Sequence, residues 1–193
     1  MQASPKEHLQ QLLIGLCSTD EDEVILERMC AEVIEVSDTK ATFKDESFEY
    51  ERAKGLKISN KFPQSFRDIA SLFNKLSWYD GGAGFIINDK GHTSGYATRF
   101  FKEAEDYYDN FDTQWFDDPD YETTTSFEIT QNGLYFDPKH TLDNGEPAMA
   151  YMDHGVLKWV QVESVNHLNY KQILLRMLSD CMIETKYIKE IFY

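Results

Sequence analysis

Residues 103–122, EAEDYYDNFDTQWFDDPDYE, hold nine carboxylates and six aromatic rings and contain no lysine or arginine. Side chains of these types could do two kinds of chemistry. Carboxylate oxygens bind divalent cations such as calcium and magnesium, and clustered negative charge attracts basic proteins. The acids are Glu103, Glu105, Asp106, Asp109, Asp112, Asp117, Asp118, Asp120 and Glu122, and the rings are Tyr107, Tyr108, Phe111, Trp115, Phe116 and Tyr121.

A calcium loop of the EF-hand type does not fit this segment. Asp118, Asp120 and Glu122 match positions one, three and five of such a loop. Position six is Thr123 where the loop needs glycine, and position twelve is Ile129 where it needs glutamate. An irregular carboxylate site for magnesium or calcium stays open as an alternative, in which residues 117–122 serve a metal-dependent hydrolase.

A surface for a basic protein fits the segment better. Closely spaced acids repel one another, and a basic partner offsets that repulsion, while aromatic rings supply contact area at interfaces. A second interpretation is an acidic surface helix and loop whose rings pack inward. The predicted partner-binding residues are Tyr107, Tyr108, Asp109, Asp112, Trp115, Asp117, Asp118 and Asp120.

Other catalytic patterns are weak. The five histidines form no H-x-x-x-H or H-E-x-x-H pair, and the chain has no G-x-S-x-G motif. His154, beside Asp153, is interpreted as a turn residue. The glycines of residues 81–84 follow an expected helix and precede an expected strand, which is the reverse of the order in a phosphate-binding loop. We therefore predict no cofactor and no catalytic residue.

Composition narrows the class of partner. The net charge is −15, from 19 basic and 34 acidic residues, which disfavours direct binding to nucleic acid or to an anionic membrane. The three cysteines, Cys17, Cys30 and Cys181, match no zinc or redox spacing and are expected to be free, with Cys17 and Cys181 as small buried hydrophobes. Without a secretory signal or an apolar run of 18 residues, a cytoplasmic location is expected.

Helical spacing predicts three helices before the acidic segment. The first carries Leu9, Leu12, Leu13 and Leu16 on one stripe. Ser18 to Glu21 is interpreted as a capping box that starts a second helix, which ends near Glu35. A short hairpin is expected over residues 41–52. A third helix is expected to start near Pro63, to carry Phe66, Ile69, Leu72, Phe73 and Leu76, and to end at Gly81 and Gly82.

The second half of the chain is expected to supply strands and a closing helix. A strand is predicted at 84–88 and a helix at 99–110, from which the acidic segment continues into a loop. One hairpin is predicted around Asn132-Gly133 and another around residues 153–155, with a turn-rich link at 137–147. A long helix is predicted from Asn169 to Ile183. The expected fold is one α+β domain over residues 1–193, with N-terminal helices, a central antiparallel sheet built from hairpins and a long C-terminal helix.

The stretch Phe62-Pro63-Gln64-Ser65-Phe66, followed by an apolar helix and the glycine pair Gly81-Gly82, resembles the SUKH superfamily. This family includes bacterial immunity proteins that neutralise polymorphic toxins, and fungal cell-wall regulators. The resemblance covers chiefly residues 58–90, with a looser likeness from 126 to 183. It implies an α+β fold and a non-enzymatic protein that binds a toxin.

Together these features predict an acidic cytoplasmic binding protein, an immunity protein that neutralises a basic toxin or nuclease by occlusion. Three alternatives stay open. The first is a phage-type nucleic-acid mimic that inhibits a host defence protein. The second is the metal-dependent hydrolase described above. The third is a structural module whose acids serve solubility alone.

Overall fold

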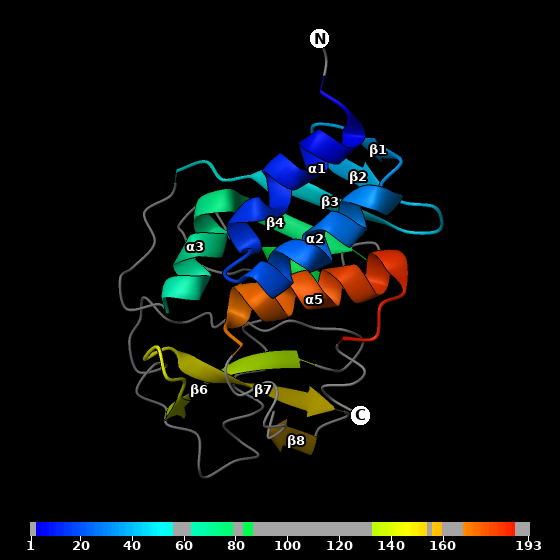
Figure 1. Cartoon of the computed structure of the whole chain (residues 1–193). Helices are drawn as coiled ribbons and strands as arrows, with labels where there is room; N and C mark the ends of the chain where they lie inside the picture. Colours follow the sequence, from blue (N-terminus) through cyan, green and yellow to red (C-terminus); the bar gives the residue numbers. More distant parts are fainter. Residues whose placement is uncertain are drawn as a thin grey trace.

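The computed structural model describes residues 3–55, 63–78, 83–86, 133–153, 156–159 and 168–187. In 83–86, 133–140, 147–153 and 156–159 it describes the course of the backbone. Helices precede and follow two antiparallel sheets, which confirms the predicted α+β class (Figure 1). Within the described residues the antiparallel strands form two sheets, one of β1 to β5 and one of β6 to β8.

The N-terminal helices are α1 (Pro5–Leu13), the 3-10 turn η1 (Ile14–Leu16) and α2 (Asp20–Glu32). The predicted cap of α2 was wrong by one residue. Thr19 is the N-cap, and its side chain accepts a hydrogen bond from the Asp22 N–H while the Asp22 carboxylate accepts one from the Thr19 N–H. The Asp22 carboxylate accepts hydrogen bonds from two backbone N–H groups, those of Ser18 and Thr19. This favours a capping box that starts at Thr19 over one that starts at Ser18.

Helix α2 is also shorter than predicted, because Glu35 belongs to strand β1 (Glu35–Val36). Its buried side chains include Ile25, Leu26 and Met29, whereas Val24 is 54% exposed.

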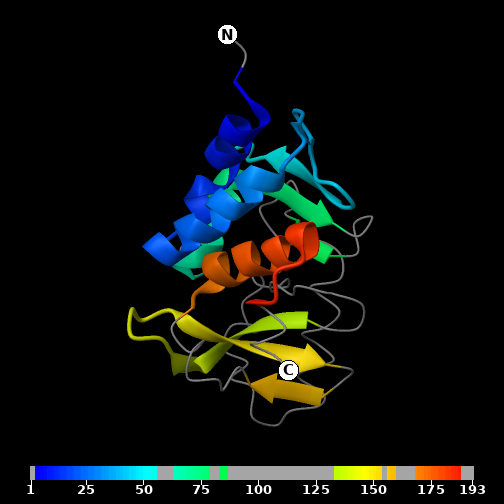
Figure 2. The same ribbon diagram turned by 45° about the vertical axis from the view of Figure 1, so that its right-hand side comes forward.

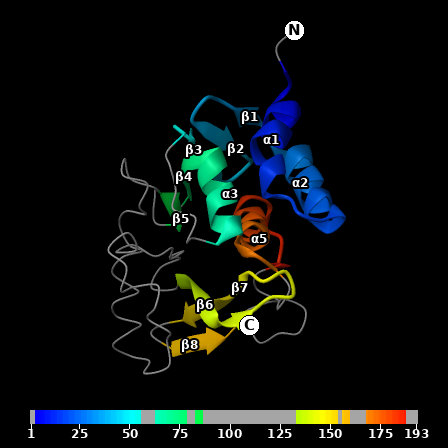
Figure 3. The ribbon, with the colours of Figure 1, turned by 90° about the vertical axis from the view of Figure 1, so that its left-hand side faces the viewer.

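The five-stranded sheet runs in the order β1-β2-β3-β4-β5, and each neighbouring pair is antiparallel. Its further strands are β2 (Lys40–Thr42), β3 (Ser47–Arg52), β4 (Phe73–Trp78) and β5 (Ala83–Ile86). The predicted hairpin at 41–52 is confirmed as β2 and β3. In β3 Phe48 and Tyr50 are buried while Glu49 and Glu51 are exposed, so one face of this strand packs into the core and the other faces solvent. The helices cover the core side of the sheet (Figure 3).

The predicted third helix is the main error of the sequence analysis. Helix α3 covers only Gln64–Leu72, and Phe73 starts strand β4 with extended backbone angles. Both β3 and β5 pair with β4, so its backbone hydrogen bonds are satisfied on both sides. The glycine pair therefore follows a strand, where the resemblance had placed the end of a helix.

A bulge in β4 completes the core. Glu51 pairs with Lys75 and Arg52 pairs with Phe73, which leaves Asn74 as an extra residue. Strict alternation would place Phe73 on the face opposite to Leu76. The bulge restores its position, because Phe73 and Leu76 are both fully buried. The Asn74 side chain accepts a hydrogen bond from the Lys54 N–H at 3.1 Å.

Helix α5 (Tyr170–Ile183) confirms the predicted closing helix, and Asn169 is its N-cap. It lies against α2 and α3 (Figures 1 and 2). After Ile183 the chain turns through Glu184, whose φ is 52°, and Tyr187 packs back on the core. The core cluster of the described residues is drawn from residues 9–78 and 168–182. Helix α5 therefore packs into the same core as the elements of the first 78 residues.

The second sheet contains β6 (Gly133–Thr141), β7 (Pro147–Asp153) and β8 (Val156–Trp159) in that order. The predicted β7–β8 hairpin is confirmed. The predicted link at 137–147 was wrong, because β6 continues to Thr141 and pairs with β7. The first strand of the hairpin predicted around Asn132-Gly133, over residues 126–131, and the predicted helix 99–110 lie outside the described residues.

Candidate functional site

The predicted partner-binding segment lies in the connection between β5, which ends at Ile86, and β6, which starts at Gly133. These strands belong to different sheets. All eight predicted contact residues lie outside the described residues: Tyr107, Tyr108, Asp109, Asp112, Trp115, Asp117, Asp118 and Asp120. Their role therefore stays a prediction.

A buried polar network joins α2 to α5. The Asp22 carboxylate is fully buried and accepts hydrogen bonds from Arg176 Nη1 at 2.6 Å and from Gln172 Nε2 at 3.0 Å. The carboxylate also accepts hydrogen bonds from the N–H groups of Ser18 and Thr19, each at 2.9 Å. Arg176 donates further to the Gln172 carbonyl at 3.2 Å, and its Nη2 lies 3.5 Å from a Glu21 carboxylate oxygen.

This network is suited to structure and unsuited to catalysis. Burial by itself raises the pKa of the Asp22 carboxyl, but the hydrogen bonds from Arg176, the Ser18 N–H and Gln172 outweigh burial and hold the pKa below its ordinary value. Three of these hydrogen bonds end on Oδ2 and the fourth ends on Oδ1, and the fully buried carboxylate is closed to solvent and substrate. It therefore acts as a fixed negative charge between two helices and has no capacity to act as a general base.

Sequence analysis missed this network. Asp22 appears in the sequence as one of four acids in the first turn of α2, Asp20 to Glu23, where the helix dipole favours negative charge. Gln172 and Arg176 are four residues apart on a largely apolar helix, and that spacing was the available signal.

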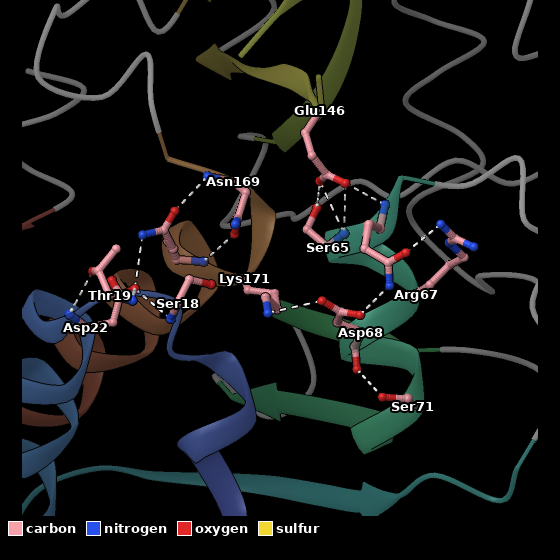
Figure 4. A network of polar contacts seen from close by, with 12 residues as sticks. Ser18, Thr19, Asp22, Ser65, Arg67, Asp68, Ser71, Glu146, Asn169 and Lys171 are labelled. Atoms are coloured by element: carbon pink, nitrogen blue, oxygen red, sulfur yellow. Dashed lines mark hydrogen bonds and ion pairs between the residues drawn. The ribbon is translucent and has the colours of Figure 1, made fainter. Parts of the chain in front are cut away.

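A second polar contact ties the β6–β7 turn to helix α3 (Figure 4). The Glu146 carboxylate accepts the N–H of Gln64 at 2.6 Å, the N–H of Ser65 at 3.2 Å and the Ser65 hydroxyl. The first N–H groups of a helix have no partner within the helix, and its dipole favours a negative charge there. Pro63 at the N-cap of α3 has no side-chain acceptor that could bind these N–H groups. Glu146, more than 80 residues away in the sequence, caps the helix in its place.

A further polar contact connects α3 to α5. Lys171 Nζ lies 3.1 Å from an Asp68 carboxylate oxygen, and the Asp68 carboxylate also accepts from the Gln64 side chain at 2.6 Å. Helix α3 is thus held at its N-terminus by hydrogen bonds to Glu146 and along its side by the ion pair of Asp68 with Lys171 (Figure 4).

Two hollows open on the described surface. The first, of about 360 Å³, is lined by His8 of α1, by Ser37 to Thr39 and by Tyr50 to Arg52 of β3. The Tyr50 hydroxyl donates to the Ser37 carbonyl, and burial raises the pKa of that phenol. No hydrogen bond joins His8 to a hydroxyl or thiol within the described ranges, so this hollow lacks an activated nucleophile.

The second hollow, of about 530 Å³, runs between α1 and α2, and we call it the α1–α2 groove. Its lining includes Lys6 and Ile14 on the first helical segment and Glu23, Val24, Glu27 and Arg28 on the second. Charges of both signs and apolar side chains therefore share this surface.

Metal ligation by protein side chains is not seen in the described portion of the chain, which contains no group of three histidine, cysteine or acidic residues that could hold a cation. None of the three cysteines is in a disulfide, and Cys30 is buried. Cys17 and Cys181 pack against the core but are only partly buried, so the expectation that both are buried holds only in part. Desolvation is the largest cause that raises the pKa of the Cys17 thiol, to about 12. No helix in the described ranges is long and apolar enough to span a bilayer.

Comparison with known proteins leaves the resemblance to the SUKH superfamily as a prediction. No protein-family model, no curated protein and no solved structure matches this chain.

Proposed function

We propose that this protein is an acidic binding protein that neutralises a basic toxin or nuclease by covering its active site, as an immunity protein does. The observation that carries the proposal is the composition of residues 103–122, which hold nine of the 34 acids of the chain and none of its 19 basic residues. The resemblance to the SUKH superfamily supports the same conclusion, because that family includes toxin-neutralising immunity proteins.

The described framework offers a suitable support for such a segment. Residues 103–122 fall in a connection between two antiparallel sheets, and the five-stranded sheet is packed against helices. Binding residues are commonly carried by connections that a rigid scaffold positions. The core cluster of described residues is drawn from chain regions on both sides of this connection.

In the proposed mechanism the carboxylates act first. Asp109, Asp112, Asp117, Asp118 and Asp120 attract the basic partner and raise the association rate, an effect that salt weakens. Tyr107, Tyr108 and Trp115 then form the contact, since aromatic side chains dominate the energetics of many interfaces. The bound protein blocks access of nucleic acid or another substrate to the active site of the partner.

The first experiment is capture of partners from a lysate of the source organism at low and at high salt, read by mass spectrometry. The proposal expects one basic protein that is recovered at low salt and depleted at high salt. Addition of DNA or RNA then tests the type of partner, because a nuclease or nucleic-acid-binding partner should be released by its own substrate. Recovery of no specific basic protein under either condition contradicts the proposal.

The second experiment separates local from overall charge. One variant changes the five steering aspartates to asparagine, which removes five of the net negative charges. The matched control removes five exposed acids from the described surface, through changes at Glu32, Glu35, Asp38, Glu46 and Asp143 to the corresponding amides. Both variants carry the same net charge. The proposal expects the association rate to fall at least tenfold more in the first variant, and equal losses in the two variants would refute a local steering surface.

A further inference from the structure

The hollow of about 360 Å³ between α1, the β1–β2 turn and the end of β3, which we call the α1–β3 hollow, has one wall that is held firmly in place. The Ser37 N–H donates to the Lys40 carbonyl at 2.8 Å, and the Ser37 hydroxyl accepts the Lys40 N–H at 3.1 Å. The Tyr50 N–H donates to the Thr39 carbonyl at 2.8 Å, and the Tyr50 hydroxyl donates to the Ser37 carbonyl. None of these bonds uses the carboxylate of Asp38, which lines the hollow without a hydrogen bond or ion pair.

Arg52 brings a guanidinium group to the same hollow. Alternate side chains of a strand point to the same side of the sheet, and Phe48 and Tyr50 of β3 point into the core. The extra residue of the bulge belongs to β4, so β3 keeps its alternation and Arg52 follows on the core side, where its side chain is exposed. Of the four arginines in the described ranges, three donate hydrogen bonds to other side chains, and Arg52 is the one whose guanidinium has no hydrogen bond or ion pair.

The charges of Arg52 and Asp38 act at a shared point in the hollow. Burial is the largest cause that raises the pKa of the Tyr50 phenol, while Arg52 lowers this pKa and Asp38 raises it. The two charges therefore lie near the same hydroxyl, although they form no ion pair with each other. Glu51, the other carboxylate of the lining, is already in an ion pair. The hollow thus presents one positive and one negative charge without an ionic partner, beside the imidazole of His8.

We propose that the α1–β3 hollow binds a free α-amino acid. The carboxylate of the ligand fits the guanidinium of Arg52, because arginine binds carboxylates through two parallel hydrogen bonds. The ammonium group of the ligand fits the Asp38 carboxylate. A volume of about 360 Å³ lies at the lower end of the range for small-molecule sites, roughly 300–1,000 Å³, and suits a ligand of this size better than a nucleotide.

Other classes of ligand satisfy only one of the two charges. A phosphate or a simple carboxylate is attracted by Arg52 but repelled by Asp38, and an amine meets the reverse pattern. A metal ion needs several ligands, and no group of three histidine, cysteine or acidic residues gathers in the ranges that the structure describes. An α-amino acid pairs with both charges at once. The hollow is separate from residues 103–122, so this inference does not depend on the proposed function.

NMR titration of the full chain with the common amino acids tests the inference. Glycine carries both charges and no side chain, whereas acetate and methylamine each carry one of the charges. Saturable shifts of the amide signals of residues 36–39 and 50–52 are expected with glycine or with another common amino acid. Acetate and methylamine should bind about tenfold more weakly, because each lacks one charge-assisted contact. No saturable shift with any of the amino acids, or equal binding of acetate and the best amino acid, would overturn the inference.

Two pairs of exposed positions assign the binding to this hollow. Arg52→Gln and Asp38→Asn each remove one of the two charges, and each should weaken binding of the amino acid about tenfold. Both residues are exposed, so both variants are expected to fold, which circular dichroism checks. Lys44→Gln and Asp45→Asn are the matched controls, because these residues form an exposed ion pair at 3.4 Å in the β2–β3 turn and do not line the hollow. Equal losses in the test variants and the controls would contradict binding at this site.

Discussion

Replacement of Arg176 by methionine is expected to lower the free energy of unfolding by about 3–5 kcal/mol, because it leaves the buried Asp22 carboxylate without its cation. The Arg176 side chain is 3% exposed and that of Asp22 is fully buried, and the two are joined at 2.6 Å. Water therefore cannot replace the lost partner. Two of the four hydrogen bonds to Asp22 come from backbone N–H groups of the α2 cap, so the carboxylate is held in place after the substitution.

Lys171→Met is the control on the same helix. Lys171 pairs with Asp68 at 3.1 Å, but the Asp68 side chain is 34% exposed and can turn to water. Loss of this partly exposed pair should cost at most about 1 kcal/mol. The comparison isolates burial of the orphaned carboxylate as the source of the larger effect.

Equilibrium unfolding in urea, followed by circular dichroism, measures both variants and the double variant Asp22→Asn/Arg176→Met. Removal of the charge from Asp22 should recover part of the cost of Arg176→Met, because the buried site then contains no unpaired ion. A loss below 1 kcal/mol for Arg176→Met would refute the reasoning. Strictly additive effects in the double variant would do the same.

The pH dependence gives an independent check on Asp22. Its pKa is held below the ordinary value in the folded protein, so the folded state binds fewer protons than the unfolded state near that pH. The stabilisation is complete above the unfolded pKa of about 3.9 and is lost as the pH falls through the lower folded pKa. The stability difference between the wild type and Asp22→Asn should be constant from pH 5 to 8 and should shrink below pH 4.

Three further predictions follow from single contacts. Thr19→Ala should cost about 0.5–2 kcal/mol in urea unfolding, because Thr19 is the N-cap of α2, whereas Ser18→Ala should cost far less. Glu146→Ala should speed hydrogen exchange of the first two amides of α3 and cost about 1 kcal/mol, whereas Asp143→Ala in the same turn should change neither. With its pKa raised to about 12 from 9.0, the Cys17 thiol should react with iodoacetamide at pH 8 on the order of a thousandfold more slowly than in urea-unfolded protein.

Elements with strong local signals could be predicted from the sequence. The α5 helix has an Asn169 cap, an apolar stripe and no proline or glycine in its interior, and its bounds were predicted correctly. The β7–β8 hairpin likewise follows from its turn residues. In both cases the signals are contained within a few residues of the element.

Strand β4 shows where local signals fail. Phe66, Ile69, Leu72, Phe73 and Leu76 have helical spacing, yet the helix ends at Leu72. The remaining residues pair with β3 and β5, and the bulge at Asn74 brings both Phe73 and Leu76 into the core. Pairing with two neighbouring strands satisfies the backbone of the segment, and this gain depends on residues distant in the sequence.

The sequence by itself determined the acidic character of the chain, its α+β class, its capped closing helix and the concentration of acids and rings in residues 103–122. Only the tertiary structure decided that Arg176 compensates Asp22, that Glu146 caps α3, and that Ile14 and Val24 share one groove. The physical reason is distance along the chain. Capping and helical stripes act between residues a few positions apart, whereas buried ion pairs, remote caps and surface grooves form only when packing brings separated residues together.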